Sequence, residues 1–201
     1  MSHKFNAQNK HNLFNDLRKK ILPADKILKK VGLSKGMFFA DIGCGNGYFT
    51  LPASEIVGHL GKVFALDISE EMLYDLQIKI QNSNNSDNIN NIKIIKSLEN
   101  SLPIDNDIID MAFSSNVLHE VNNPDLFIKE IKRILKLNAK IVIIDWEKND
   151  NNNLNVNYNY GPNINHRISI EAVQKILKQN EFKDISYFTI ENIFYCITAI
   201  K

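Results

Sequence analysis

The chain has little cysteine, no excess of one charge and no long apolar run. Its 201 residues contain two cysteines, Cys44 and Cys196, too few for a disulfide framework or a zinc cluster and in keeping with a reducing compartment. Lysine and arginine (24) nearly cancel aspartate and glutamate (23), so the positive field that dominates nucleic-acid affinity is missing. The longest apolar runs are strand-length, and residues 1–15 have no apolar region of the kind that a secretion signal needs. We therefore expect two free thiols, no metal, no nucleic-acid or membrane partner, and a cytoplasmic protein.

The length and composition favour a single domain. A chain of 201 residues with 44% hydrophobic content can bury one substantial core but hardly two. We expect one domain over residues 1–201, made of an N-terminal helical cap (1–34) and an α/β core (35–201). The sequence does not determine the oligomeric state.

Short β-rich segments alternate with longer amphipathic ones along the core. The expected strands are residues 36–42, 61–68, 91–97, 108–115, 139–146, 185–190 and 193–200. The expected helices are residues 46–58, 69–81, 123–136 and 169–180, with Ser69 and Ser169 as N-caps and Pro124 in a first turn. This alternation is typical of a parallel sheet with crossover helices.

The last two expected strands are separated by too few residues for a crossover, so the final strand must run antiparallel to its neighbour. The sequence thus predicts an α/β fold with a seven-stranded, mostly parallel sheet, its last strand antiparallel, and helices on both faces. Two asparagine-rich stretches, 81–91 and 149–163, are expected to be loops. The second follows the strand at 139–146 and would lie at the sheet edge that receives ligands, so its role stays open.

A glycine-rich loop stands where the first expected strand gives way to a helix. In "ADIGCGNGYFT" (40–50), Gly43, Gly45 and Gly47 follow directly after Asp41. A tight turn alone needs one glycine. Three glycines also let a ligand approach the bare backbone beside the positive end of a helix beginning near Asn46. The loop therefore predicts a site for a nucleotide-type cofactor.

A second acid, Asp67, ends the next expected strand about 20 residues after Gly47, where an acid can accept both hydroxyls of a ribose. Asp67 could instead cap the following helix, but Ser69 is better placed for that role. The spacing G-x-G-x-G departs from the dinucleotide fingerprint G-x-G-x-x-G, and the chain has no G-x-x-x-x-G-K-[ST] motif. A dinucleotide site and a P-loop are therefore disfavoured.

Four segments, taken in order, resemble the class I S-adenosylmethionine-dependent methyltransferases. They are "ADIGCGNGYFT", "VFALDIS", "SLENSLPIDNDIIDMAFSSNVLHEV" and "LKLNAKIVIIDW". The resemblance covers about residues 20 to 200 and is closest to small-molecule members, such as the quinone-biosynthesis and arsenite methyltransferases. It implies a Rossmann-like fold, S-adenosylmethionine as cofactor, and transfer of its methyl group to a small-molecule acceptor by in-line displacement.

The resemblance also implies which residues bind the cofactor. Asp41 and the backbone of Gly43 would hold the amino group of the methionine half, and Asp67 would hold the ribose. The loop would surround the carboxylate, and residues after the second and third strands would lie against the adenine. Asn116 would line the path between cofactor and acceptor. The full set is Asp41, Gly43, Gly45, Asn46, Gly47, Asp67, Ile68, Met72, Ser97, Leu98, Glu99 and Asn116.

The acceptor side offers fewer signals. A sulfonium already makes the methyl carbon electrophilic, so the protein must hold a nucleophile in line and manage any proton. His119, just beyond the fourth expected strand, is the candidate catalytic residue. The candidate substrate-binding residues are Trp146, His166 and Arg167. A core or rim aromatic explains Trp146 better than a substrate platform does, and a solvated loop explains His166 and Arg167 equally well. Of the remaining candidates for proton transfer, Glu120 is expected at the surface or as a cap, and Asp145 suits a loop cap as well as a functional role.

The acceptor itself is not identified by the sequence. Two cysteines, each in a different segment, disfavour arsenite as the acceptor, and the absence of N-P-P-Y and D-P-P-Y motifs disfavours DNA bases and protein glutamine. Two other classes of function stay open. One is a nicotinamide-dependent oxidoreductase, and the other is a non-catalytic module that binds S-adenosylmethionine.

Overall fold

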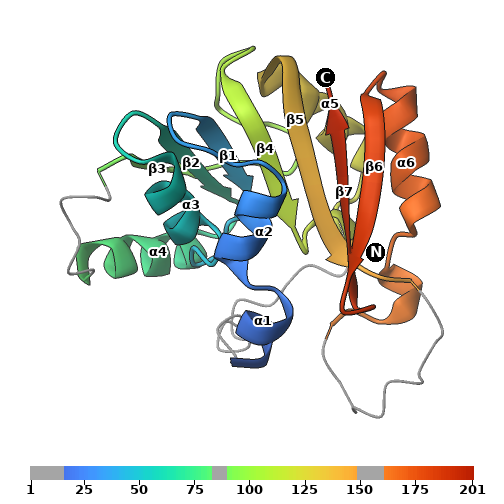
Figure 1. Ribbon diagram of the computed structural model, residues 1–201, viewed down its shortest axis with the longest axis horizontal. Helices are drawn as coiled ribbons and strands as arrows, with labels where there is room; N and C mark the ends of the chain where they lie inside the picture. Colours follow the sequence, from blue (N-terminus) through green and yellow to red (C-terminus); the bar gives the residue numbers. More distant parts are fainter. Residues whose placement is uncertain (1–15, 83–89, 149–160) are drawn as a thin grey trace.

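The computed structural model describes residues 16–82, 90–148 and 161–201 (Figure 1). The first fifteen residues of the expected cap lie outside the described residues. Most of the two asparagine-rich stretches, at residues 83–89 and 149–160, also lies outside the described residues.

One seven-stranded sheet forms the centre of the molecule, with the strand order β3-β2-β1-β4-β5-β7-β6. Its strands are β1 (Phe38–Ile42), β2 (Lys62–Asp67), β3 (Ile92–Lys96), β4 (Ile109–Ser115), β5 (Leu135–Trp146), β6 (Lys183–Ile190) and β7 (Phe194–Ile200). The first five strands pair in parallel, whereas β7 pairs antiparallel with both β5 and β6. The predicted fold class, with the last strand antiparallel, is confirmed.

Helices cover both faces of the sheet. They are α1 (Asp16–Ile21), α2 (Ala24–Lys30), α3 (Thr50–Val57), α4 (Glu70–Asn82), α5 (Pro124–Ile134) and α6 (Ile170–Gln179), with 3-10 turns η3 (Leu118–Glu120) and η4 (Ile164–His166). Buried residues of α2 and α3 pack on one face, and those of α5 and α6 pack on the other. Figure 1 shows α2 and α3 in front of the sheet and α5 behind it.

The helix starts follow the predicted caps. Ser69 and Ser169 accept hydrogen bonds from the backbone N–H groups of Met72 and Ala172, at 3.3 Å in both cases. Pro124 stands in the first turn of α5, where its missing N–H costs no hydrogen bond.

Two boundaries differ from the sequence prediction. Helix α3 begins at Thr50 and not near Asn46, because Gly45 and Gly47 have positive φ angles of 52° and 92° that no α-helix contains. Helix α5 ends at Ile134, and β5 begins at once with Leu135, which pairs with Ile109 before a register shift. The fifth strand is therefore longer at its start than the predicted segment 139–146.

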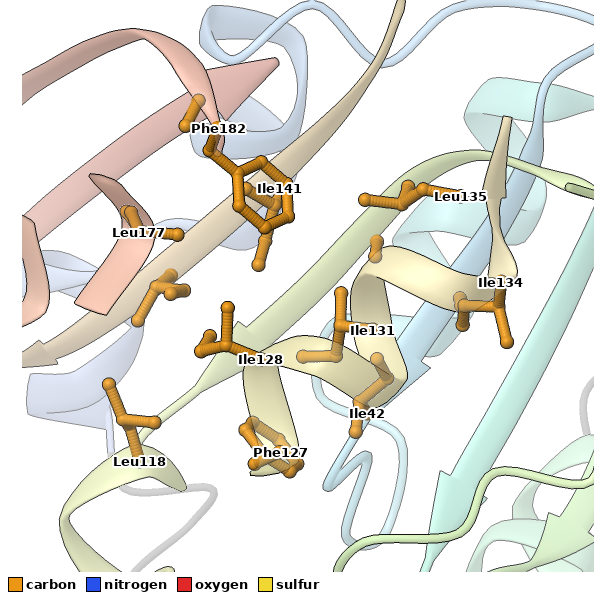
Figure 2. Packing of buried hydrophobic residues seen from close by; sticks show 14 of the residues in the cluster. Ile42, Leu118, Phe127, Ile128, Ile131, Ile134, Leu135, Ile141, Leu177 and Phe182 are labelled. Carbon is orange, nitrogen blue, oxygen red and sulfur yellow. The ribbon is translucent and has the colours of Figure 1, made fainter. Parts of the chain in front are cut away.

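The larger part of the core lies between the sheet and helices α5 and α6. Helix α5 turns one apolar stripe inward, as its spacing of large residues requires. Figure 2 shows this stripe meeting side chains of the sheet and of α6; the residues involved include Phe127, Ile128, Ile131, Ile134, Ile42, Ile141 and Leu177. This packing fixes the position of α5 against the sheet. It therefore also fixes the position of the segment that joins β4 to α5.

The part of the predicted cap that the structure describes packs into the core on the α3 face. Leu22, Ile27 and Leu28 are buried in the same cluster as Phe39 and Phe49. The hydroxyl of Tyr48 donates to the carbonyl of Leu22 over 2.7 Å. This contact ties α1 to the glycine loop.

Both cysteines are buried free thiols. No helix within residues 16–82, 90–148 and 161–201 has the length and apolar character needed to cross a membrane.

Two loop glycines are required by packing against the protein itself. A Cβ at Gly43 would lie 2.2 Å from Cγ2 of Val117, and one at Gly47 would lie 2.4 Å from Cδ1 of Leu76. Both glycines also have positive φ angles. The sequence attributed these glycines to close approach of a ligand, whereas the structure gives contact with Val117, just before η3, and with Leu76 of α4 as a sufficient cause.

The packing at Gly43 predicts that Gly43→Ala destabilises the protein more than Gly36→Ala does. Gly36 has a similar φ angle of 84° with nothing within 4 Å of its ideal Cβ. The backbone strain, about 1 kcal/mol, is thus common to both variants. Overpacking against Val117 adds about 1 to 3 kcal/mol for Gly43→Ala alone. Urea denaturation measures the difference, and equal losses in the two variants would contradict the packing argument.

Candidate functional site

The carboxyl ends of the parallel strands meet at one edge of the sheet, called here the ligand edge. Strand β1 lies between β2 and β4, so the chain moves to one side after β1 and later returns to the other. Open α/β sheets bind ligands in the crevice at such a point. Asp41, Asp67, Asn116 and Asp145 all stand at or just beyond the ends of these strands.

The glycine loop is held against β2 by its own backbone. The N–H groups of Gly43 and Cys44 both donate to the carbonyl of Leu66, at 2.8 and 2.9 Å. The N–H of Gly45 donates to Oδ2 of Asp67 over 2.8 Å. The loop is therefore shaped before any ligand binds, and contact of Gly43 with an amino group would use its carbonyl oxygen.

Asp67 is fixed by hydrogen bonds to both of its carboxylate oxygens. Oδ2 accepts from Gly45, and Oδ1 accepts from the N–H of Ser69 over 2.8 Å. Burial raises the pKa of Asp67 above its ordinary value, and these backbone donors counter part of that effect. Because each carboxylate oxygen has a second lone pair, Asp67 can still accept from two hydroxyls.

Asp41 is almost fully buried at the end of β1. Its Oδ2 accepts a hydrogen bond from the hydroxyl of Thr50 over 2.6 Å. Burial, together with the nearby charge of Asp67, raises the pKa of Asp41 to about 7 against the opposing effects of Thr50 and Arg18. A buried carboxylate in this state is stabilised by any cation that binds beside it.

Arg18, which the sequence reasoning missed, lies beside this acid. Its guanidinium carbon lies 4.3 Å from the centre of the Tyr48 ring. Burial lowers the pKa of Arg18 to about 10, while Tyr48 and Asp41 raise it. A cationic group and a carboxylate thus flank the glycine loop. Nothing in the sequence of α1 distinguishes Arg18 from the neighbouring lysines, so only the fold identifies it.

An apolar surface lies beyond Asp67. Ile68 is 48% exposed and Leu98 is 68% exposed, although both are large aliphatic residues at strand ends. Met72, expected beside them, is buried within the protein. Exposed aliphatic side chains at this place suit one face of a planar ring, whereas a buried Met72 is not available for such contact.

The segment after β3 forms a tight turn that is tied to the loop after η3. Ser97 is buried, and its N–H donates to the carbonyl of Asp67 over 3.0 Å. The carboxylate of Glu99 accepts from the backbone and side-chain nitrogens of Asn122, at 2.8 and 2.7 Å. The structure therefore gives Glu99 a role in joining these two loops.

His119 and Asp145 form a buried pair. Nδ1 of His119 lies 2.7 Å from Oδ1 of Asp145, and the N–H of His119 donates to Oδ2 over 3.1 Å. Oδ1 also accepts from the N–H of Trp146 over 2.7 Å. The side chains of His119 and Asp145 are only 6% and 1% exposed. Asp145 thus holds the imidazole by its Nδ1 edge and fixes the turn of η3 that carries it.

Glu120, which the sequence placed at the surface or in a cap, is partly buried beside His119. Its Oε1 lies 3.6 Å from Nε2 of His119, and its side chain is 24% exposed. Burial alone would lower the pKa of His119, but the hydrogen bonds to Asp145 and Glu120 raise it to about 9. His119 is therefore an imidazolium at neutral pH, held between two carboxylates.

The three predicted substrate-binding residues are brought together only in part. The guanidinium carbon of Arg167 lies 5.4 Å from the centre of the Trp146 ring, and its Nη1 donates to the carbonyl of Glu147 over 2.9 Å. Arg167 and Trp146 thus form one unit at the end of β5. His166 is exposed on η4, and Arg167 fastens this segment to the end of β5.

Buried oxygens that lack partners collect at the ligand edge. Among the described residues, every buried side-chain oxygen without a hydrogen-bond partner stands at or near a strand end on this edge: Asn46 Oδ1, Ser114 Oγ, Ser115 Oγ, Asn116 Oδ1, Glu147 Oε2 and Tyr195 OH. Buried polar groups are almost always paired. Their concentration here marks an edge built to receive a polar ligand, and it is the observation by which a nucleoside-type cofactor fits the residues present.

Comparison with known proteins gives a family for the chain. A family model described as "Methyltransferase domain" matches residues 33–189. A solved S-adenosylmethionine-dependent methyltransferase from Aquifex aeolicus superposes with a TM-score of 0.86 at 29% identity, covering 98% of this chain and 99% of that one.

Two relatives bear the name demethylmenaquinone methyltransferase. The protein from Lactococcus lactis is 33% identical over 122 residues, covering 60% of this chain and 46% of the relative. The protein from Staphylococcus aureus (strain MRSA252) is 28% identical over 120 residues, covering 60% and 47%. The chain thus spans about half the length of these relatives.

The burial of Asp41 predicts a pH-dependent gain in stability for Asp41→Asn. The folded pKa of Asp41, about 7, lies above its unfolded value of about 3.8. Its contribution to stability is therefore complete below pH 3.8 and is lost as pH rises through 7. In Asp41→Asn, Thr50 can still donate to the amide oxygen, and the side chain has no proton to lose as pH rises. The melting temperature of this variant should therefore exceed that of the wild type by about 4 °C or more at pH 8.

Differential scanning calorimetry from pH 5 to pH 8 measures this gain. Asp25→Asn, at an exposed site on α2, serves as the control. A constant difference between Asp41→Asn and the wild type across this range would contradict the assignment of the raised pKa to Asp41.

Proposed function

The chain belongs to the methyltransferase-domain family, and we propose that it transfers the methyl group of S-adenosylmethionine to a small-molecule acceptor. The observation that carries this proposal is the ligand edge, where two fixed acids, a preformed glycine loop and the unpaired buried oxygens lie beside a buried His–Asp pair. The cytoplasmic location expected from the sequence stays a prediction.

The residues of the ligand edge suit the parts of the cofactor in turn. The amino group would bind Asp41 and the carbonyl of Gly43, and the carboxylate would lie near Arg18 and the loop of Gly45, Asn46 and Gly47. Asp67 would accept from the ribose hydroxyls. The adenine would lie on Ile68 and Leu98, with Ser97 and Glu99 in the turn beside it. Asn116 would face the path to the acceptor.

When bound, S-adenosylmethionine supplies a methyl carbon that its sulfonium makes electrophilic. The protein must then orient the acceptor and take up a proton. His119 in its neutral form is the residue for this task, because Asp145 fixes its Nδ1 edge and Nε2, 3.6 Å from Oε1 of Glu120, would face the acceptor. A base with a pKa of about 9 matches a phenolic hydroxyl, whose pKa is about 10.

The acceptor class follows from the relatives and from the site. Two relatives bear the name demethylmenaquinone methyltransferase, and the reduced form of such a quinone is an aromatic diol. Trp146 with Arg167 offers a flat, cationic surface for an aromatic ring. We take naphthalene-1,4-diol, kept reduced with ascorbate, as the probe for this class.

The two other functions considered from the sequence make different predictions. A nicotinamide-dependent oxidoreductase would be stabilised by NAD or NADP, and a non-catalytic module would bind S-adenosylhomocysteine without turnover. A thermal-shift screen with these three ligands, followed by an assay with radiolabelled S-adenosylmethionine and the diol, separates them. Stabilisation by S-adenosylhomocysteine together with labelled product supports the proposal.

Asp67→Ala should weaken binding of S-adenosylhomocysteine by about a hundredfold or more, because a charged acceptor contributes about 1.5 to 3 kcal/mol for each of two hydrogen bonds. Alanine also releases the N–H groups of Gly45 and Ser69, so Asp67→Asn, which keeps one acceptor oxygen, should lose less. Calorimetric titration measures both variants. Glu55→Ala, at an exposed site on α3, is the control, and wild-type affinity in Asp67→Ala would remove Asp67 from the site.

His119→Ala should lower kcat at least tenfold at saturating diol and leave the affinity for S-adenosylhomocysteine nearly unchanged. In the wild type, kcat should rise with pH and level off above about 9, as His119 loses its proton. Asp145→Asn should move this break toward the ordinary histidine pKa of about 6.5. His166→Ala, the matched control, should change mainly the Michaelis constant. A pH profile that is identical in the wild type and Asp145→Asn would show that His119 is not the base.

A further inference from the structure

Two of the unpaired oxygens belong to ionisable residues that the mechanism above does not use. Tyr195 is fully buried, and its hydroxyl has no hydrogen-bond partner among the described residues. Oε2 of Glu147 is buried and equally unpaired. A buried polar atom without a partner costs stability, so two at one place require an explanation.

The sheet brings these two side chains beside the His119–Asp145 pair. Tyr195 of β7 stands directly opposite Asp145 of β5 in the antiparallel register, so their side chains share a face. Glu147 follows Asp145 by two positions, and its N–H donates to the carbonyl of Ile193. The extended pairing thus continues past β5, and Glu147 lies on the same face, diagonal to Tyr195.

The electrostatics agree with this placement. Burial raises the pKa of the Tyr195 hydroxyl, and the charges of Asp145 and Glu147 raise it further. Tyr195 therefore keeps its proton and lies within the field of both carboxylates. Burial, followed by the charge of Glu171, raises the pKa of Glu147.

We propose that the hydroxyl of Tyr195 and the carboxylate of Glu147 together bind a hydroxyl group of the acceptor and so hold its reacting atom beside His119. This inference rests on the proposed function, and it assigns a subsite for a second polar group of the acceptor.

A hydroxyl is the group that satisfies both residues at once. Tyr195 presents a proton, and Glu147 presents a lone pair. A hydroxyl accepts from the first and donates to the second. A carbonyl oxygen would leave Glu147 without a donor, and an ammonium group would leave the proton of Tyr195 without an acceptor. The subsite therefore selects a reduced, hydroxylated acceptor over its oxidised ketone form.

Removal of the tyrosine hydroxyl tests the stability side of the inference. If the hydroxyl is unpaired in the free protein, Tyr195→Phe deletes an unsatisfied polar atom at constant shape, so the melting temperature should stay the same or rise. Tyr187→Phe, at an exposed tyrosine of β6, is the matched control. A fall of about 4 °C or more in Tyr195→Phe alone would show that the hydroxyl serves the fold, which overturns the proposal.

Calorimetric titrations of the protein saturated with S-adenosylhomocysteine test the binding side. Naphthalene-1,4-diol should bind Tyr195→Phe at least tenfold more weakly than the wild type, and Glu147→Gln should weaken it in the same direction. 1-Naphthol, which has a single hydroxyl for the His119 side, should bind the wild type and Tyr195→Phe equally. Equal affinity of the diol for the wild type and Tyr195→Phe overturns the subsite.

These titrations distinguish a failure of the proposed function from a failure of the hydroxyl subsite. If S-adenosylhomocysteine does not bind the wild type, the proposed function fails, and the subsite fails with it. If S-adenosylhomocysteine binds and the diol does not, the proposed cofactor site stands and the hydroxyl subsite is overturned.

Discussion

The burial of Asp41 at the end of β1 is the constraint on which the ligand edge depends. A carboxylate in that position is costly unless polar groups surround it, and two separate elements supply them. Thr50 donates from the first turn of α3, and Arg18 contributes a positive charge from α1. The acid thus draws together the cap and the helix, and its pKa is still about 7, because burial and the charge of Asp67 outweigh these two effects.

Asp145, at the end of β5, differs from Asp41 in the number of hydrogen-bond donors around it. It accepts hydrogen bonds from the imidazole and N–H of His119 and from the N–H of Trp146, so its charge is balanced inside the protein. Glu120 adds a second carboxylate on the other side of the ring. Of the two buried acids, Asp41 would be stabilised by the amino group of the proposed cofactor, whereas Asp145 stabilises a cation that the protein already holds.

The sequence predicted the sheet well, because strand and helix periodicities and the short connection before β7 are local signals. It missed the start of α3, because positive φ angles in the glycine loop interrupt the helical pattern. It also missed the early start of β5, because pairing of Leu135 with Ile109 ends helix α5. The residues expected on the cofactor side could be named from the sequence because they lie in short motifs, and their roles stay predictions. The pairing of His119 with Asp145 could not, because it joins β5 to a 3-10 turn whose orientation is set by packing around Leu118. Tyr195 and Glu147 give no sequence signal, since a missing partner is visible only in three dimensions.

The two buried acids also divide the work of the proposed reaction. Groups that bind parts of a substrate whose charge does not change hold the ground state and the transition state equally, and so contribute to affinity but not to rate. Asp41 and Asp67, which would bind an amino group and a ribose, are of this kind. In the proposed reaction only His119 would interact with a proton that moves, and Asp145 would act through it. The ligand edge would therefore separate affinity, controlled from β1 and β2, from turnover, controlled from β5 and η3. The unpaired oxygens between these strands lower the stability of the free protein at the place where a bound ligand restores it.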